Sequence, residues 1–175
     1  MESNLAIREA RQDDIATIRD LADRIWRASY PGIISEEQIA YMLKWMYSAE
    51  KIREEMTNES IRYLIASEQD SGIACGFAAF GPGEESHEVF LHKLYVLPEC
   101  QRQGIGTAMM AEIETLSQTM KAQAIALRVN RGNTNAIGAY EKFGFLKTRE
   151  LCSDIGGGFV MDDFLMTKPL TPSDS

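Results

Sequence analysis

The residues best suited to chemistry lie in the stretch QRQGIGTAMM, positions 101–110, where an arginine and two glycines open a run with helical spacing. The first N–H groups of a helix have no partner inside the helix, and the helix dipole adds partial positive charge there. Gly104 and Gly106 would let an anion approach this backbone closely, and Arg102 supplies a further cation. The stretch therefore indicates a binding site for a phosphate or a pyrophosphate.

This pattern has a plainer alternative, because glycines also occur in tight strand-to-helix turns that bind nothing. It also differs from two familiar phosphate loops. The nucleotide P-loop ends in Gly-Lys-Ser/Thr, whereas Thr107 follows Gly106 directly in this chain. The dinucleotide-binding fingerprint has a third glycine at the position that Met109 occupies.

The elements that must position this stretch follow from the pattern of apolar residues. Strand-like runs predict strands at residues 4–10, 61–68, 73–82, 88–97, 124–130, 144–151 and 159–168. Helical spacing predicts helices at residues 13–28, 36–47, 48–58, 105–116 and 134–143. Ser35 and Gln38 resemble a capping box before the second of these helices. This order of strands and helices predicts an α/β domain with a mixed sheet.

Length and composition set limits on the kind of protein. The 175 residues, 45% of them hydrophobic, suit one globular domain, which we expect at residues 1–170, followed by a disordered tail at 171–175. The N-terminus lacks the apolar centre of a signal peptide and no apolar run could span a membrane, so we expect a cytoplasmic protein. The net charge of −8 argues against nucleic acid as a partner. Cys75, Cys100 and Cys152 match no metal-binding pattern and are interpreted as reduced thiols.

Two segments in order carry a resemblance to a known family. LYVLPECQRQGIGTAMM followed by LRVNRGNTNAIGAYEKFGF resembles the Gcn5-related N-acetyltransferase (GNAT) family. One segment is similar to motif A, with its signature at Gln101, Gly104 and Gly106, and the other is similar to motif B, which runs from Asn133 or Asn135 to Phe145. The resemblance implies a single-domain GNAT fold with a central mixed, mostly antiparallel, twisted sheet of about seven strands. About four helices would flank this sheet, and its central strand pair would be splayed.

The resemblance also implies acetyl coenzyme A as a co-substrate and no metal. The pyrophosphate would lie on the N–H groups from Gln103 to Thr107, and the pantetheine arm would pair with the free edge of the preceding strand. The expected cofactor contacts are Leu94, Tyr95, Val96, Arg102, Gln103, Gly104, Ile105, Gly106, Thr107, Asn133, Asn135 and Lys142. For either asparagine an ordinary role as helix N-cap is an equal alternative. Lys142 could reach a phosphate of the cofactor or be a solvated lysine.

The catalytic residues that the resemblance implies are Tyr140 and His92. Tyr140 occupies the general-acid position that would protonate the sulfur of coenzyme A, although it could instead pack with Ala136 and Phe143. His92 stands where many relatives carry a glutamate base. A histidine has a suitable pKa for proton abstraction at neutral pH, but a plain strand histidine is an equal alternative.

The acceptor should be a small cationic amine. Trp26 and Tyr30, four residues apart, would line its pocket or else serve in packing. The C-terminal sequence resembles that of the polyamine-acetylating PaiA proteins, so Asp162, with Asp154 and Asp163, would meet an ammonium group or simply lie on an exposed hairpin. Acetylation of a peptide N-terminus or lysine, and a non-catalytic acyl coenzyme A sensor, are the alternative functions. We expect direct transfer, no membrane partner and a possible homodimer.

Overall fold

The computed structural model describes residues 4–172, so the first three and last three residues, including 173–175 of the expected tail, lie outside the described residues. The seven described strands are β1 (Leu5–Glu9), β2 (Arg62–Glu68), β3 (Ala74–Pro82), β4 (Glu88–Val96), β5 (Ala124–Asn130), β6 (Leu146–Gly156) and β7 (Phe159–Pro169). Their order in the sheet is β1-β2-β3-β4-β5-β7-β6. The mixed α/β architecture predicted from the sequence is thus confirmed.

Five α-helices are described where about four were expected. They are α1 (Ile15–Ser29), α2 (Glu36–Met46), α3 (Ala49–Asn58), α4 (Ile105–Thr119) and α5 (Thr134–Phe143), with short 3-10 turns η1 (Gln12–Asp14) and η2 (Pro98–Cys100). No helix within residues 4–172 is both long and apolar enough to cross a membrane. The chain divides into two compact units, residues 1–81 with 93–113 and residues 82–92 with 114–175, and β4 contributes to both.

In the first unit, β1, β2 and β3 form an antiparallel ladder. The apolar stripe predicted for α1 is confirmed, because Ile15, Ile18, Ala22 and Ile25 are all buried. Ser35 caps α2 as expected, since its hydroxyl accepts a hydrogen bond from the Gln38 N–H at 3.0 Å.

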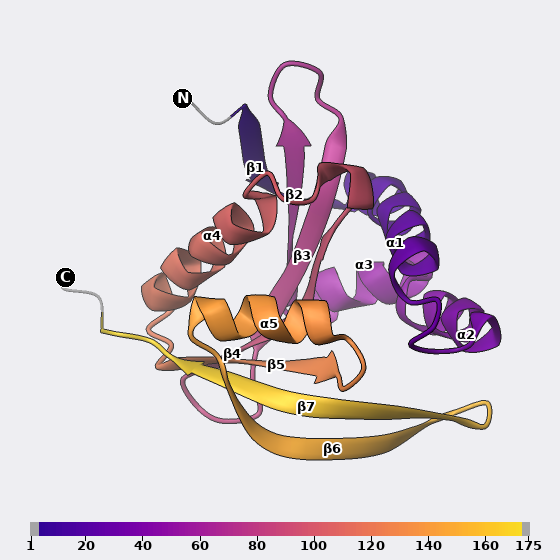
Figure 1. The fold of residues 1–175 in the computed structure, drawn as a ribbon. Coiled ribbons are helices and arrows are strands. Elements are labelled where there is room, and N and C mark those ends of the chain that lie inside the picture. The colour runs from indigo at the N-terminus through magenta and orange to yellow at the C-terminus, as the bar shows by residue number, and fades with distance from the viewer. Residues whose placement is uncertain (1–3, 173–175) are drawn as a thin grey trace. The chain divides into compact units, whose positions relative to one another are not determined.

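The two faces of this ladder are covered by different helices (Figure 1). Phe77 of β3 contacts Tyr47, the residue that ends α2. The neighbouring Gly76 lies close to Met109 of α4. Because successive strand residues point to opposite faces, α2 and α4 lie on opposite sides of β3.

In the second unit, the first residues of β4 pair in parallel with β5, from Glu88–Ala124 to Leu91–Leu127. The β5–β7 and β6–β7 pairs are antiparallel, and Figure 1 shows β6 and β7 as a long hairpin. The glycines at its tip, positions 156 to 158, all have positive φ angles, which favour glycine. Gly144, expected to begin the hairpin, instead ends α5 as a left-handed C-cap with φ of 102°.

Candidate functional site

The turn between β4 and α4 exposes the backbone groups that an anion would use. The first intrahelical hydrogen bond of α4 runs from the Ala108 N–H to the Gly104 carbonyl at 2.9 Å. The N–H groups of Ile105, Gly106 and Thr107 therefore precede the first helical donor. Before them, the side chain of Gln101 donates a hydrogen bond to the Val96 carbonyl at 3.2 Å, which ties the turn to the end of β4.

The space beside this backbone is open at both glycines. A Cβ atom added at Gly104 would meet no atom within 4 Å, and one added at Gly106 would meet only Val96 Cγ2 at 4.0 Å. Gly104 has φ of 79°, a left-handed conformation that favours glycine. A phosphate group can therefore approach the start of α4 without displacing a side chain.

Arg102 lies in the same turn and is exposed. Its φ of 64° is also left-handed, which is uncommon for a residue other than glycine and costs on the order of 1 kcal/mol or more. The chain thus keeps a cationic side chain beside the open backbone at a conformational cost.

A close backbone contact fixes the end of β4, and no local pattern in the sequence indicates it. A Cβ atom at Gly76 would lie 2.5 Å from the Tyr95 carbonyl oxygen and 3.2 Å from Val96 Cα. The Leu97 N–H donates to the Cys75 carbonyl at 2.8 Å. Glycine at position 76 therefore lets β3 lie directly against the segment expected to receive the pantetheine arm.

The structure brings Trp26, Tyr30 and Tyr95 together. The Trp26 and Tyr30 rings stack with centroids 4.3 Å apart, and the Tyr95 ring lies 6.0 Å from that of Trp26. The hydroxyl groups of Tyr30 and Tyr95 are 3.4 Å apart. Trp26 is 2% exposed and Tyr30 8%, so both also pack in the core, and their contact with an acceptor stays a prediction.

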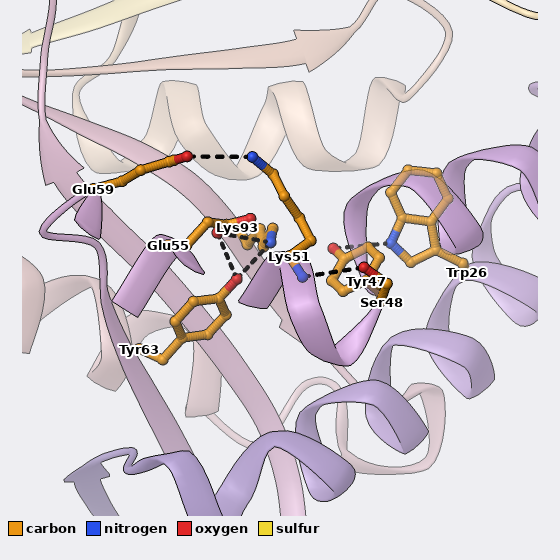
Figure 2. A network of polar contacts seen from close by, with 8 residues as sticks. All are labelled: Trp26, Tyr47, Ser48, Lys51, Glu55, Glu59, Tyr63 and Lys93. Carbon is orange, nitrogen blue, oxygen red and sulfur yellow. Dashed lines mark hydrogen bonds and ion pairs between the residues drawn. The ribbon is translucent and has the colours of Figure 1, made fainter. Parts of the chain in front are cut away.

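A buried polar network lies next to this cluster (Figure 2). Lys93 Nζ donates to the Tyr63 hydroxyl at 2.6 Å and lies 3.4 Å from Glu55 Oε2, while the Tyr63 hydroxyl donates to the same carboxylate at 2.8 Å. The ammonium also lies 4.5 Å from the centroid of the Tyr47 ring, and the Tyr47 hydroxyl accepts from Trp26 Nε1 at 3.3 Å.

Burial dominates the protonation of this network. It lowers the pKa of Lys93, against the opposing effect of the Glu55 charge, and it raises the pKa of both Tyr47 and Tyr63. The two tyrosines therefore stay protonated, and the Tyr63 hydroxyl can donate its hydrogen bond to Glu55. Sequence reasoning missed this network entirely.

In the second unit, α5 carries the residues of motif B. Asn133 is its N-cap, because its side chain accepts a hydrogen bond from the Ala136 N–H at 3.3 Å. The ring of Tyr140 is half-buried and meets that of Phe145 edge-on at 5.7 Å. Asn135 and Lys142 are exposed. A cofactor role for these residues stays a prediction.

His92, the expected base, is exposed on β4, and its ring lies 4.8 Å from the Phe90 ring, in an edge-on arrangement. Its role as a base stays a prediction. Each of the three aspartates of the last hairpin has a protein partner, at 3.3 Å from Asp162 to Arg131, 3.2 Å from Asp163 to Arg128, and 2.9 Å from Asp154 to the Gly156 N–H. An ammonium group would share Asp162 with Arg131, so this prediction also stays open.

Cys100 immediately precedes the phosphate turn. Burial raises the pKa of its thiol to about 11, and a hydrogen bond with the Cys75 thiol adds to this effect. A raised pKa disfavours the thiolate, which is the nucleophilic form of a cysteine, so this environment gives no support to a covalent role for Cys100.

Comparisons with known proteins agree with this arrangement. The profile of the acetyltransferase (GNAT) family matches residues 16–145. The spermidine N(1)-acetyltransferase of Thermoplasma acidophilum is 29% identical over 146 residues, which are 81% of this chain and 88% of that protein. The uncharacterized N-acetyltransferase YuaI of Bacillus subtilis is 31% identical over 111 residues, 62% of this chain and only 61% of its own length.

A solved structure provides a further comparison. The PaiA N-acetyltransferase from Thermoplasma acidophilum, in complex with coenzyme A, superimposes with a TM-score of 0.78 at 28% identity and covers 94% of this chain and 98% of its own. The predicted family and fold are thereby confirmed. This chain belongs to the acetyltransferase (GNAT) family and is an N-acetyltransferase of that type.

Proposed function

We propose that this protein transfers an acetyl group from acetyl coenzyme A directly to a primary amine of a small cationic molecule, with polyamines such as spermidine as the first candidates. The observation that carries the proposal is the open, left-handed turn at Arg102–Gly104 that leads into the bare start of α4. A relative that acetylates spermidine and a neighbour that binds coenzyme A support it.

The cofactor would be held along its length by main-chain groups. The N–H groups from Gln103 to Thr107 would bind the diphosphate, with Arg102 alongside. The strand residues Leu94–Val96 would pair with the amides of the pantetheine arm. Acetyl coenzyme A supplies the reactive thioester, and the N–H of Val96 would polarise its carbonyl oxygen.

The acceptor must lose a proton before it can react. The pKa of an alkyl amine, near 10.4, lies about 3.4 units above pH 7. Converting the protonated amine to its neutral form at this pH therefore costs about 4–5 kcal/mol. His92, or a chain of water molecules, would take this proton, and Tyr140 would return one to the departing sulfur.

The test is release of free thiol from acetyl coenzyme A in the presence of separate amines. Turnover with spermidine or spermine, and weaker turnover with short diamines, is the expected result. Turnover with peptides alone would refute a small amine as the acceptor and favour peptide acetylation. Tight binding of coenzyme A without turnover on any acceptor would refute a catalytic function and favour a sensor.

A further inference from the structure

Lys93 is an ionisable residue buried in the first unit, among the polar groups of Figure 2. Its side chain is 3% exposed and that of Glu55 is 6% exposed. Buried ion pairs add little to stability, because the cost of removing both charges from water offsets their attraction. Stability alone therefore does not explain why this pair is buried. The position of Lys93 on β4 suggests that the pair holds this strand in place.

The ammonium of Lys93 joins β4 to three other elements. Tyr63 belongs to β2, Glu55 belongs to α3, and Tyr47 ends α2, so the contacts at 2.6, 3.4 and 4.5 Å converge from three directions (Figure 2). An ammonium group has three donors and is fixed by such an arrangement, whereas an apolar side chain of the same length would make no directional contact.

The next anchor on β4 lies two residues further along. Tyr95 points to the same side of the strand as Lys93, since the strand period is two. It contacts Trp26, Phe77 and the hydroxyl of Tyr30. The segment Leu94–Val96, which would bind the pantetheine arm and polarise the thioester, begins between these two anchors and ends one residue past Tyr95.

We propose that Lys93 is a positioning residue that, through Glu55, Tyr63 and Tyr47, fixes the backbone of Leu94–Val96 for acetyl transfer. This inference rests on the proposed function for its effect on turnover. A small displacement of reacting groups costs up to about 100-fold in rate, so the effect should fall on kcat. Coenzyme A affinity should fall less than kcat, because the diphosphate turn, which lies beyond Val96, keeps its own contacts with the cofactor.

The test uses the double variant Lys93→Met with Glu55→Gln. Lys93→Met alone would leave a buried carboxylate without its cation and could fail to fold. The double variant removes both charges, keeps both shapes and retains a hydrogen bond from the Tyr63 hydroxyl to the amide oxygen. It should therefore unfold within about 3 °C of the parent protein.

The matched control is an exposed ion pair at α3, the helix that carries Glu55, between a residue of this helix and its C-cap. Lys51 and Glu59 also form a 3.4 Å ion pair, but their side chains are 38% and 42% exposed. Lys51→Met with Glu59→Gln removes the same charges from the surface. This control should leave unfolding, turnover and amide exchange unchanged.

Two readouts decide the matter in the full-length proteins. In the buried double variant, amide hydrogen exchange in residues 94–97 should accelerate at least about tenfold, and kcat should fall by about 10- to 100-fold with the coenzyme A Kd within about threefold. Exchange equal to that of the parent protein at these amides overturns the inference. If the parent protein releases no thiol with any amine, the proposed function fails, while the exchange comparison still decides the role of Lys93.

Discussion

The substitution Gly106→Ala separates the stability of α4 from its ability to bind a diphosphate. A Cβ atom at this position would meet only Val96 Cγ2, at 4.0 Å, so the folded protein accepts it without a clash. Alanine is favoured over glycine in a helix by roughly 0.5–1 kcal/mol. At about 2–4 °C per kcal/mol for a protein of this size, the midpoint of thermal unfolding should rise by about 1–4 °C.

Binding should change in the opposite direction. In the proposed site a side chain larger than methyl would fill the space beside the N–H groups at the start of α4. Gly106→Val should therefore lower coenzyme A affinity by tenfold or more, about 1.4 kcal/mol, and Gly106→Ala should lower it less. Titration calorimetry with coenzyme A and thermal unfolding measure the two effects. Gly138→Ala is the control, because a Cβ atom there, within α5, also meets nothing within 4 Å. A Gly106→Val protein that folds and binds coenzyme A normally would refute the assignment of this turn.

Three further predictions concern other parts of the molecule. Tyr140→Phe should lower kcat by about 100-fold or more while the coenzyme A Kd stays within about threefold, as measured by thiol release and calorimetry; an unchanged rate would mean that solvent protonates the sulfur. Gly76→Ala should destabilise the fold by about 1–3 kcal/mol in urea unfolding, because its Cβ would lie 2.5 Å from the Tyr95 carbonyl, and unaltered stability would contradict this contact. Arg8 lowers the pKa of Asp14 from 3.8 to about 2, so this pair stabilises the fold above pH 4 and its contribution is lost as the pH falls toward 2. Asp14→Asn should flatten the pH dependence of stability in that range, and an unaltered acid-unfolding curve would count against the pair.

Most of the fold could be predicted because its signals are local. The stripe of Ile15, Ile18, Ala22 and Ile25 follows the helical period, and all four residues are buried. Ser35 precedes α2 as a capping residue should, and it accepts the expected hydrogen bond. Gly144 shows the limit of this reasoning, since a glycine between a helix and a strand is equally suited to ending one or beginning the other.

The turn into α4 could also be predicted, because two closely spaced glycines follow a strand-like run and precede a helical one. Its role in binding a phosphate stays a prediction. The residues that support this turn could not be predicted. Gly76 has no distinguishing neighbours in the sequence, and its need for a small side chain arises only where the Tyr95 carbonyl approaches it. Such a requirement depends on tertiary contact alone.

The buried network escaped prediction for the same reason. Glu55 lies in a helix rich in charged residues, where a solvated side chain is the natural expectation. Its partner Lys93 is 38 residues away in sequence, on strand β4. Charge pairing over such a distance has no periodic signal, so only the folded structure could bring these residues together.

The most direct test of the diphosphate site is a titration of the ¹⁵N-labelled protein with coenzyme A, followed by amide chemical shifts. We predict that the largest shifts fall on the N–H groups from Gln103 to Thr107, with smaller ones along Leu94–Val96. Saturable binding that leaves the amides at the start of α4 unmoved would contradict this site.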